Sequence, residues 1–218
     1  MVESLTKELE SQYTTRVDVF SQTERYVKEM DVFIRELEPK ASHLYLDVGC
    51  GSGNAMNYIT GKTGCDAKGI EQFESYIALS NCKERITLAN AHHIPFEDNT
   101  FDFVTIIHVI GHVEDPVQVM REALRVTKPG GKIGIVTPNK WHIYAMRPLN
   151  WLKILKYTPD PTLLRLYSCG SLQSDLQKAG WNTVKTFTFG NLPKFLQPVL
   201  KNNIAFLKER VFAFATKN

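Results

Sequence analysis

The most constraining feature of this sequence is an apolar run that ends in a carboxylate and is followed by three glycines at alternate positions. Residues 45–53 read Tyr-Leu-Asp-Val-Gly-Cys-Gly-Ser-Gly, with Asp47 two residues before the first glycine. Glycine reaches backbone angles that are closed to other residues, and it carries no Cβ. A strand that ends in such a turn brings bare backbone against a ligand and leaves amides free to bind it.

Strand and helix signals alternate after Pro39, which ends a helical pattern over residues 3–38. Strands are expected over residues 44–48, 67–71, 85–89, 101–107 and 132–137, and helices over residues 54–60, 74–81 and 115–127. Asp115 and Pro116 suit the N-cap and first turn of the last of these helices, and Pro129-Gly130-Gly131 is expected to turn the chain into the fifth strand. This alternation predicts a parallel sheet covered on both faces, with right-handed crossovers.

We expect one α/β domain over residues 1–218, Rossmann-like, with a mainly parallel seven-stranded sheet. Its expected parts are a helical N-terminal cap (1–39), a ligand-binding core (40–137), an inserted lid (138–167) and a C-terminal helix and strand pair (168–218). Within the last part, a helix is expected over residues 168–179, strands over 181–189 and 210–216, and helical spacing over 192–207.

The polar candidates gather at one edge of this predicted sheet. The glycine loop, Glu71, Asn90 and His108 each follow a predicted strand. In open parallel sheets, ligands bind beyond the carboxyl ends of the strands. The sequence therefore predicts a single binding site formed by all four.

The glycine spacing bears on the kind of ligand. It is G-x-G-x-G, whereas dinucleotide-binding folds use G-x-G-x-x-G. A fixed carboxylate at Asp47 would repel a pyrophosphate, but it could hold an ammonium group directly or through water. The pattern therefore disfavours a nicotinamide-dependent oxidoreductase and favours a cofactor with an amino-acid end, such as S-adenosylmethionine.

Four stretches in order resemble the class I S-adenosylmethionine-dependent methyltransferases, in particular the small-molecule group with ubiquinone-type and sterol-type enzymes. They are residues 46–53, Gly69-Ile70-Glu71, Ile94-Pro95-Phe96 with Phe101-Asp102-Phe103-Val104, and Arg125-Val126-Thr127-Lys128-Pro129-Gly130-Gly131. The resemblance covers about residues 40–137 and implies methyl transfer to a small molecule, at oxygen, nitrogen or carbon; Trp141, Tyr144, Met146 and Trp151 would suit an apolar or aromatic one. The alternative is a non-catalytic S-adenosylmethionine-binding protein.

The resemblance also implies which residues contact the cofactor. The expected contacts are Asp47, Gly49, Cys50, Gly51 and Gly53 for the methionine portion, Glu71 and Gln72 for the ribose, and Asn90, Ala91 and His92 for the adenine. A carboxylate such as Glu71 has two oxygens for the two ribose hydroxyls. Asn90 stands where family members often have an aspartate, and its side-chain carbonyl could accept the adenine amino group without the charge.

Two histidines are the candidate catalytic residues. His108, at the end of the fourth strand, could be a general base, a polar wall of the cofactor and substrate pocket, or a structural residue. His112 could line the pocket or be structural. No H-E-x-x-H pattern is present, so no metal is expected. Methyl transfer itself asks mainly for alignment and exclusion of water, because the sulfonium is already activated.

The aromatic and basic segment after the fifth strand is the expected substrate wall. Trp141, Tyr144 and Trp151 would supply it, with Tyr13 and Arg16 from the N-terminal segment closing over the cofactor. The interleaved Lys and Arg would also suit contact with a membrane surface. Plain packing of an inserted helix onto the domain is the alternative.

The charge distribution separates this segment from the core. Residues 1–137 carry 14 Lys and Arg against 20 Asp and Glu, whereas residues 138–218 carry 12 against 3. The basic part favours an acidic substrate or an anionic membrane surface, or else is simply solvated. Without a recognisable binding module, no nucleic acid is expected. The polar start, the lack of a long apolar run and four scattered cysteines favour a cytoplasmic protein with reduced thiols, while the oligomeric state stays open.

Overall fold

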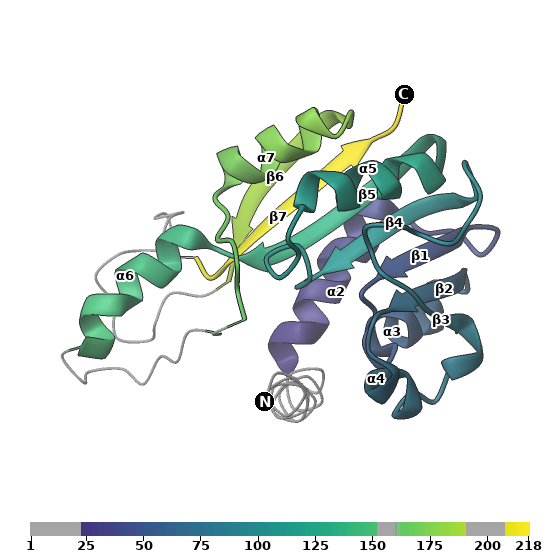
Figure 1. Ribbon diagram of the computed structural model, residues 1–218, viewed down its shortest axis with the longest axis horizontal. Coiled ribbons are helices and arrows are strands. Elements are labelled where there is room, and N and C mark those ends of the chain that lie inside the picture. Colours follow the sequence, from purple (N-terminus) through teal and green to yellow (C-terminus); the bar gives the residue numbers. More distant parts are fainter. Residues whose placement is uncertain (1–22, 152–159, 161, 191–207) are drawn as a thin grey trace.

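The computed structural model describes residues 23–151, 160, 162–190 and 208–218, with the backbone alone at 148–150 (Figure 1). The elements are α2 (Glu24–Leu37), β1 (Leu44–Val48), α3 (Asn54–Thr63), β2 (Asp66–Glu71), α4 (Glu74–Ala78), η1 (Lys83–Arg85), β3 (Ile86–Leu88), β4 (Phe101–Ile107), α5 (Pro116–Val126), β5 (Thr127–Pro138), α6 (Lys140–Trp151), α7 (Cys169–Lys178), β6 (Asn182–Phe189) and β7 (Arg210–Thr216). Most of the expected N-terminal cap and the helical spacing expected over 192–207 lie outside the described residues.

The strands form one seven-stranded sheet in the order β3-β2-β1-β4-β5-β7-β6. The first five in that order run parallel, and β7 is antiparallel to both β5 and β6. The predicted α/β fold with a mainly parallel seven-stranded sheet is confirmed. From β1 the chain continues to β2 on one side, while β4 lies on the other, so the end of β1 is the point at which ligands bind in such sheets.

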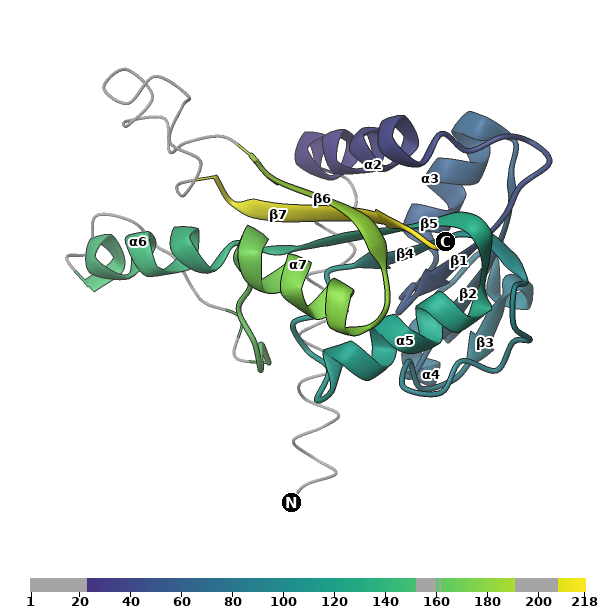
Figure 2. The same ribbon diagram turned by 90° about the horizontal axis from the view of Figure 1, so that it is seen from above.

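Each face of the sheet has its own apolar core. Because side chains alternate along a strand, Leu46 and Val48 of β1 face one core and Tyr45 faces the other. Helices α5 and α7 cover the first face, and α2 and α3 cover the second, as Figure 2 shows from above. Asp47 has the same parity as Tyr45, so its side chain is directed to the face that α2 covers.

Several boundaries differ from those expected. Helix α3 continues to Thr63, where Gly64 adopts φ 73° and its amide bonds the carbonyl of Thr60. Helix α4 ends early at Ala78, and strand β3 is shorter than predicted. The predicted turn at residues 129–131 lies inside β5, as an irregularity between the pairs Phe101–Thr127 and Phe103–Lys132.

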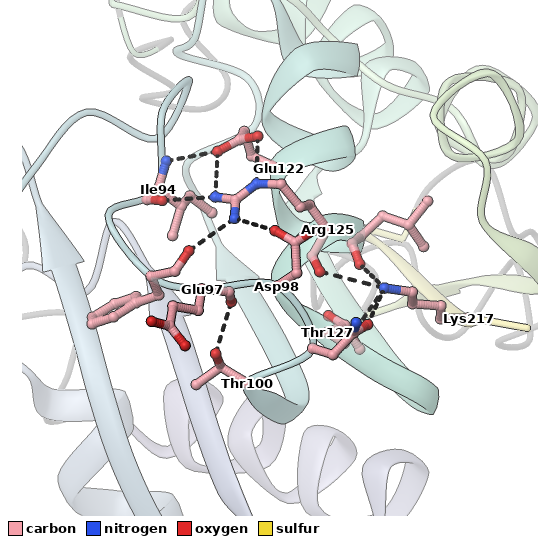
Figure 3. A network of polar contacts seen from close by, with 11 residues as sticks. Ile94, Glu97, Asp98, Thr100, Glu122, Arg125, Thr127 and Lys217 are labelled. Atoms are coloured by element: carbon pink, nitrogen blue, oxygen red, sulfur yellow. Dashed lines mark hydrogen bonds and ion pairs between the residues drawn. The ribbon is translucent and has the colours of Figure 1, made fainter.

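The loop after β3 is held to α5 by Arg125 (Figure 3). Its guanidinium donates to the carbonyls of Ile94 and Phe96, each at 2.8 Å, and to Asp98 at 2.8 Å. It also bonds both carboxylate oxygens of Glu122, at 3.0 and 2.8 Å. Planar guanidinium geometry allows five such bonds in one plane. Arg125 therefore joins two motifs of the resemblance, because the run that begins with this residue is bonded to the Ile94-Pro95-Phe96 stretch.

The carboxyl end of α5 is capped by Lys217, the residue that follows β7. The Lys217 ammonium donates to the carbonyls of Leu124 and Thr127, at 2.8 and 2.7 Å, and to Asn99 at 2.8 Å (Figure 3). A cation at this position satisfies carbonyls that have no partner within the helix. Strand β7 is thereby anchored beside the loop that follows β3.

Helix α6 projects from one end of the sheet, away from the helices that cover it, in both Figure 1 and Figure 2. It lies inside the segment that was expected to be the lid, of which residues 152–159 and 161 lie outside the described part. Across the described ranges, no helix combines the length and the apolar character that crossing a bilayer requires.

Candidate functional site

The glycine loop after β1 owes its shape to three positive backbone angles. Gly49, Gly51 and Gly53 have φ of 71°, 56° and 83°, a region that residues with a Cβ rarely enter. A Cβ on Gly49 would lie 2.4 Å from Val109 Cγ2, and one on Gly53 would lie 2.6 Å from Cys82 Sγ. At Gly51 a Cβ would meet no protein atom within 4 Å. The first and last glycines are therefore required by packing, whereas Gly51 faces open space.

The loop is fixed to the end of β2 by backbone bonds. The amides of Gly49 and Cys50 both donate to the carbonyl of Ile70, at 2.8 and 3.0 Å. The Gly51 amide donates to Glu71 Oε2 at 2.9 Å. Burial raises the pKa of the Cys50 thiol, so the sulfur stays protonated and has no nucleophilic character. The loop offers a rigid backbone surface.

Asp47 is a buried carboxylate at the base of this loop, with 1% of its surface exposed. Its register partner on β4 is Thr105, whose hydroxyl donates to Oδ1 at 2.7 Å. Burial raises the pKa of Asp47 to about 7, and the nearby Glu71 adds to the rise, against the effect of Thr105. Within the described ranges no lysine or arginine forms an ion pair with Asp47. A buried acid of this kind is stabilised by a cationic ligand.

Glu71 ends β2 as predicted and is also buried. Besides the bond from Gly51, its Oε1 accepts from the amides of Gln72 and Phe73, at 2.8 and 3.1 Å. Burial raises the pKa of Glu71, although the three amides oppose it. Oε1 already accepts two bonds, so the acceptor site that remains for a ligand hydroxyl is on Oε2. Gln72 itself is exposed.

The turn after β3 is closed by its own side chains. Asn90 Oδ1 accepts from the amide of His92 at 2.9 Å and from His92 Nδ1 at 2.8 Å. His92 Nε2 accepts in turn from the amide of Asp115 at 3.2 Å, which assigns the proton to Nδ1. The side-chain carbonyl expected to accept the adenine amino group is thus engaged within the turn. Ala91 lies between the two residues, partly exposed.

His108 is the first residue after β4 and has φ 57°, which is uncommon for a residue with a side chain. Its amide donates to the carbonyl of Val136 at 2.9 Å, and its Nε2 lies 2.8 Å from Glu29 Oε2. Glu29 is fully buried, and its Oε1 accepts from Arg210 Nε at 3.0 Å. These contacts of Glu29 with His108 and Arg210 therefore join α2, the end of β4 and the start of β7.

Tyr26 connects this group of contacts to the glycine loop. Burial raises the pKa of its phenol, and the charges of Asp47 and Glu29 raise it further. Since both carboxylates act on the same ring, Tyr26 lies near the two of them. The face of α2 that covers the sheet therefore borders the predicted site.

His112 lies in the same loop as His108 but has different partners. Its Nδ1 lies 3.0 Å from the hydroxyl of Thr162, which itself donates to Asp160 Oδ1 at 2.6 Å. Thr162 therefore accepts from a protonated Nδ1. Burial lowers the pKa of His112, and the nearby His108 lowers it further, whereas Asp160 raises it. His112 is therefore neutral at pH 7, and the two histidines are neighbours.

The aromatic residues expected in the substrate wall lie on the outside of α6. Trp141 is 50% exposed, Tyr144 40% and Trp151 81%. The buried side chains of this helix are instead His142, Ile143 and Met146. Tyr13 and Arg16, the other two residues of the expected wall, lie outside the described residues.

Two further observations concern the rest of the described structure. A cavity of about 190 Å³ lies at the opposite edge of the sheet, lined by residues such as His43, Asp102 and Lys132, and none of the residues expected to bind a ligand lines it. No cluster of His, Cys, Asp or Glu with metal-binding geometry occurs among the described residues. The candidate site is therefore the one at the carboxyl edge.

Residues 46–135 match the family model described as a methyltransferase domain. Over 110 residues the chain is 37% identical to a demethylmenaquinone methyltransferase of Bacillus mycoides, a match that spans 46% of this chain and 46% of that protein. Residues 46–135 are therefore similar to methyltransferase domains. The chain spans about half the length of this curated relative.

Solved structures agree with the fold of the methyltransferase domain. A S-adenosylmethionine-dependent methyltransferase from Archaeoglobus fulgidus superposes with a TM-score of 0.74 at 19% identity, over 94% of this chain and 99% of that one. The [4+2]-cyclase SpnF has a TM-score of 0.66 at 19% identity, over 88% and 81%. Because the second neighbour is named as a cyclase, the fold alone leaves the chemistry to the site residues.

The sequence analysis did not predict the contacts of three residues at or near the site: Glu29, Thr105 and Arg210. Thr105 was hidden because its contact with Asp47 follows from the pairing of β1 with β4, which are 58 positions apart. Glu29 did leave a signal. It lies three residues after Tyr26 and four before Phe33, so it is a single acid on the apolar side of α2.

Proposed function

We propose that this chain is an enzyme that transfers the methyl group of S-adenosylmethionine to a small molecule. The observation that carries the proposal is the open space at Gly51 together with Asp47, a buried carboxyl that forms no ion pair with a lysine or arginine of the described residues. A ligand that fills this position needs a cationic group near Asp47 and a part that packs directly against the backbone of Gly51. The amino-acid end of S-adenosylmethionine has both.

The site residues fit the rest of the cofactor. Asp47 would hold the ammonium group, and the remaining acceptor site on Glu71 Oε2 would receive a ribose hydroxyl. At the adenine end, the Asn90 side-chain carbonyl already accepts bonds from His92. Backbone donors such as the Ala91 amide would therefore bond the ring nitrogens of the adenine. When bound, the cofactor supplies a methyl group already activated by the sulfonium. The protein then has to align the acceptor and exclude water.

A small-molecule acceptor is supported by the name of the matched relative, a demethylmenaquinone methyltransferase. The adjoining histidines His108 and His112 offer polar contacts to the acceptor. We further propose that the acceptor is apolar or aromatic and is methylated at oxygen, nitrogen or carbon. Four free thiols fit a reducing compartment, and we place the enzyme in the cytoplasm.

A screen with S-adenosylmethionine labelled in its methyl group tests this function. Phenols, amines and quinols are offered in turn, and transfer of label is measured by extraction of the product. We expect transfer to at least one class, and its loss in Asp47→Ala. Tight binding of S-adenosylmethionine without transfer to any acceptor would favour a non-catalytic binding protein. Binding of NADH instead of S-adenosylmethionine would indicate that the protein is an oxidoreductase.

We also propose that the outer face of α6 contacts an anionic membrane surface. Trp141, Tyr144 and Trp151 lie three and seven residues apart, which places them on one side of the helix, opposite the buried Ile143 and Met146. Cations accompany these rings. The Lys140 ammonium lies 5.6 Å from the centre of Trp141, and the Arg147 guanidinium lies 5.2 Å from that of Tyr144. Aromatic and basic side chains on one helical face are typical of interfacial helices.

Co-sedimentation with vesicles tests this contact. The full chain should bind vesicles with one third phosphatidylglycerol, lose binding at high salt, and bind neutral phosphatidylcholine weakly. Replacing Trp141 and Trp151 by serine should reduce binding about tenfold. Leu88→Ser is the matched control, since Leu88 is 55% exposed on β3. Equal loss in both variants, or equal binding to both vesicle types, contradicts the proposal.

A further inference from the structure

The cavity at the amino edge of the sheet lies at the opposite end of β1 from the glycine loop. Its volume is about 190 Å³, and its walls come from the end of α2, the turn before β1, and strands β4 and β5. A cavity of about 150 Å³ is large enough to hold benzene. This cavity therefore has room for one aromatic ring with a small substituent.

Part of the cavity wall is apolar. Leu37, the last residue of α2, is 3% exposed, and Phe103 of β4 is 1% exposed. The ring of His43 meets that of Phe103 edge to face, with the ring centres 6.3 Å apart. Ligand pockets are mostly apolar, with a few polar groups that set the orientation. A ligand that fills this cavity therefore needs an apolar body, and an aromatic ring suits the ring of Phe103.

Both carboxylates of the cavity wall already have cationic partners. Asp102 binds the Lys128 ammonium through both oxygens, each at 2.9 Å, and its Oδ2 also accepts from the Leu44 amide at 2.9 Å. Glu38 Oε2 lies 3.0 Å from Lys132 Nζ. Burial by itself would raise the pKa of Asp102, but the Leu44 amide and Lys128 outweigh burial and lower it. Neither acid therefore needs a cation from a ligand.

Three donors of the wall have no acceptor among the residues that the structure describes. Within those residues the Lys40 ammonium forms no hydrogen bond or ion pair. The Lys132 ammonium uses two of its three protons, on Glu38 and on the carbonyl of Glu36 at 3.2 Å. His43 Nδ1 accepts from the Lys40 amide at 3.3 Å, so the ring carries its proton on Nε2, which is available to a ligand.

We propose that this cavity is a second ligand site and that it takes a small aromatic carboxylate. The ring packs on Leu37 and Phe103, and the carboxylate accepts from Lys40 and His43, with Lys132 as a further donor. The ammonium groups of Lys40, Lys128 and Lys132 outnumber the two carboxylates, and bonds from a charged donor to an anion are stronger than neutral ones. Because the site lies at the opposite edge from the glycine loop, its occupation does not depend on the proposed methyl transfer.

Benzoate is the probe for this site. Titration of benzoate into the full chain labelled with nitrogen-15 should shift the NMR signals of the Leu37, His43 and Phe103 amides in a saturable way, with a dissociation constant of about 1 mM or lower. Benzamide has the same shape without the charge, and benzylammonium carries the opposite charge. Both should bind at least about fivefold more weakly. Saturating S-adenosylhomocysteine should leave the affinity for benzoate within about twofold.

Lys40→Gln tests the contact with the carboxylate. Lys40 is exposed, and its side chain has no bond to lose within the described residues, so the variant should fold like the wild type. Binding of benzoate should weaken by about threefold to tenfold, while binding of benzamide stays within about twofold. Lys83→Gln, at an exposed lysine of η1, is the matched control and should leave the binding of both probes unchanged.

The absence of saturable benzoate binding below about 10 mM would overturn the proposal. Equally tight binding of benzylammonium would do the same, because the donors of the wall would then not select an anion. Shifts at the amides of the glycine loop instead of the amino edge, or displacement of benzoate by S-adenosylhomocysteine, would assign the probe to the other site. Equal weakening by Lys40→Gln and Lys83→Gln would reduce the contact to a general effect of surface charge.

Discussion

At the scale of single residues, Asp47 carries the most chemistry in the site. Its position before the glycines was readable from the sequence, because the carboxylate interrupts an apolar run. Its burial, the bond from Thr105 and the pKa of about 7 depend on the neighbouring strands β4 and β2. A single sequence does not reveal which strands become neighbours, so its electrostatics could be found only in the structure.

The stability of the protein without ligand should depend on this residue. The pKa of Asp47 is about 7 when folded and about 3.9 when unfolded. Between these values the folded state keeps a proton that the unfolded state has lost, so ionisation of Asp47 makes the free energy of unfolding fall as the pH rises to 7.

Asp47→Asn should therefore stabilise the ligand-free protein at pH 8 by on the order of 1–4 kcal/mol, and by much less at pH 4. Asparagine can still accept the Thr105 hydroxyl. Urea unfolding at the two pH values measures the difference, with Asp66→Asn at an exposed position of β2 as the control. The same gain at both pH values would contradict the assigned ionisation.

Ligand binding should displace the proton of Asp47. At pH 6 the carboxyl is mostly protonated in the free protein, and a cation beside it favours the ionised form. Binding of S-adenosylmethionine at pH 6 should release close to one proton, and affinity should rise towards pH 7.5. Calorimetry in two buffers of different ionisation enthalpy measures the release. Equal release by Asp47→Asn would assign it to another group.

At the scale of elements, the sequence predicted best where a local signal sets a boundary. Asp115 caps α5 through the amide of Gln118, as its position indicated. Ser168, the first residue of the range expected to be helical, caps α7 through the amide of Ser171. The sequence predicted less well where tertiary contacts decide, as for the bond between Thr105 and Asp47. The adenine contact expected of Asn90 stays a prediction, and in the structure its side-chain carbonyl closes a local turn, a habit of Asn side chains.

Arg125 should matter for the loop between β3 and β4 more than for the sheet. Arg125→Lys retains the charge but cannot form the five bonds to Ile94, Phe96, Asp98 and Glu122. We expect a loss of about 1–3 kcal/mol in the free energy of unfolding. Arg121→Lys, on an exposed face of α5, is the matched control. Equal losses in urea unfolding would mean that the network contributes little.

At the scale of the whole molecule, the sheet separates two cores, and the site lies where its central strands end. On the face of the sheet that α2 covers, Tyr26 and Glu29 of α2 lie close to Asp47. Helix α2 therefore packs beside the glycine loop and supplies side chains to the candidate site. The motif pattern predicted the fold, and the contacts of the glycine loop with the cofactor stay a prediction. It did not predict the contribution of α2 or of β7, because both come from segments far apart in the chain.

The measurement that tests the central claim most directly is a calorimetric titration of S-adenosylmethionine into two alanine variants. Gly51 and Gly130 both have positive φ, of 56° and 77°, and in both a Cβ would meet no protein atom within 4 Å. Their backbone strain is therefore alike, but Gly51 lies in the cofactor loop and Gly130 at the far edge of the sheet. We predict that Gly51→Ala weakens binding at least tenfold, about 1.4 kcal/mol, and that Gly130→Ala stays within twofold of the wild-type affinity. Equal affinities in the two variants would contradict the assignment of this loop to the cofactor.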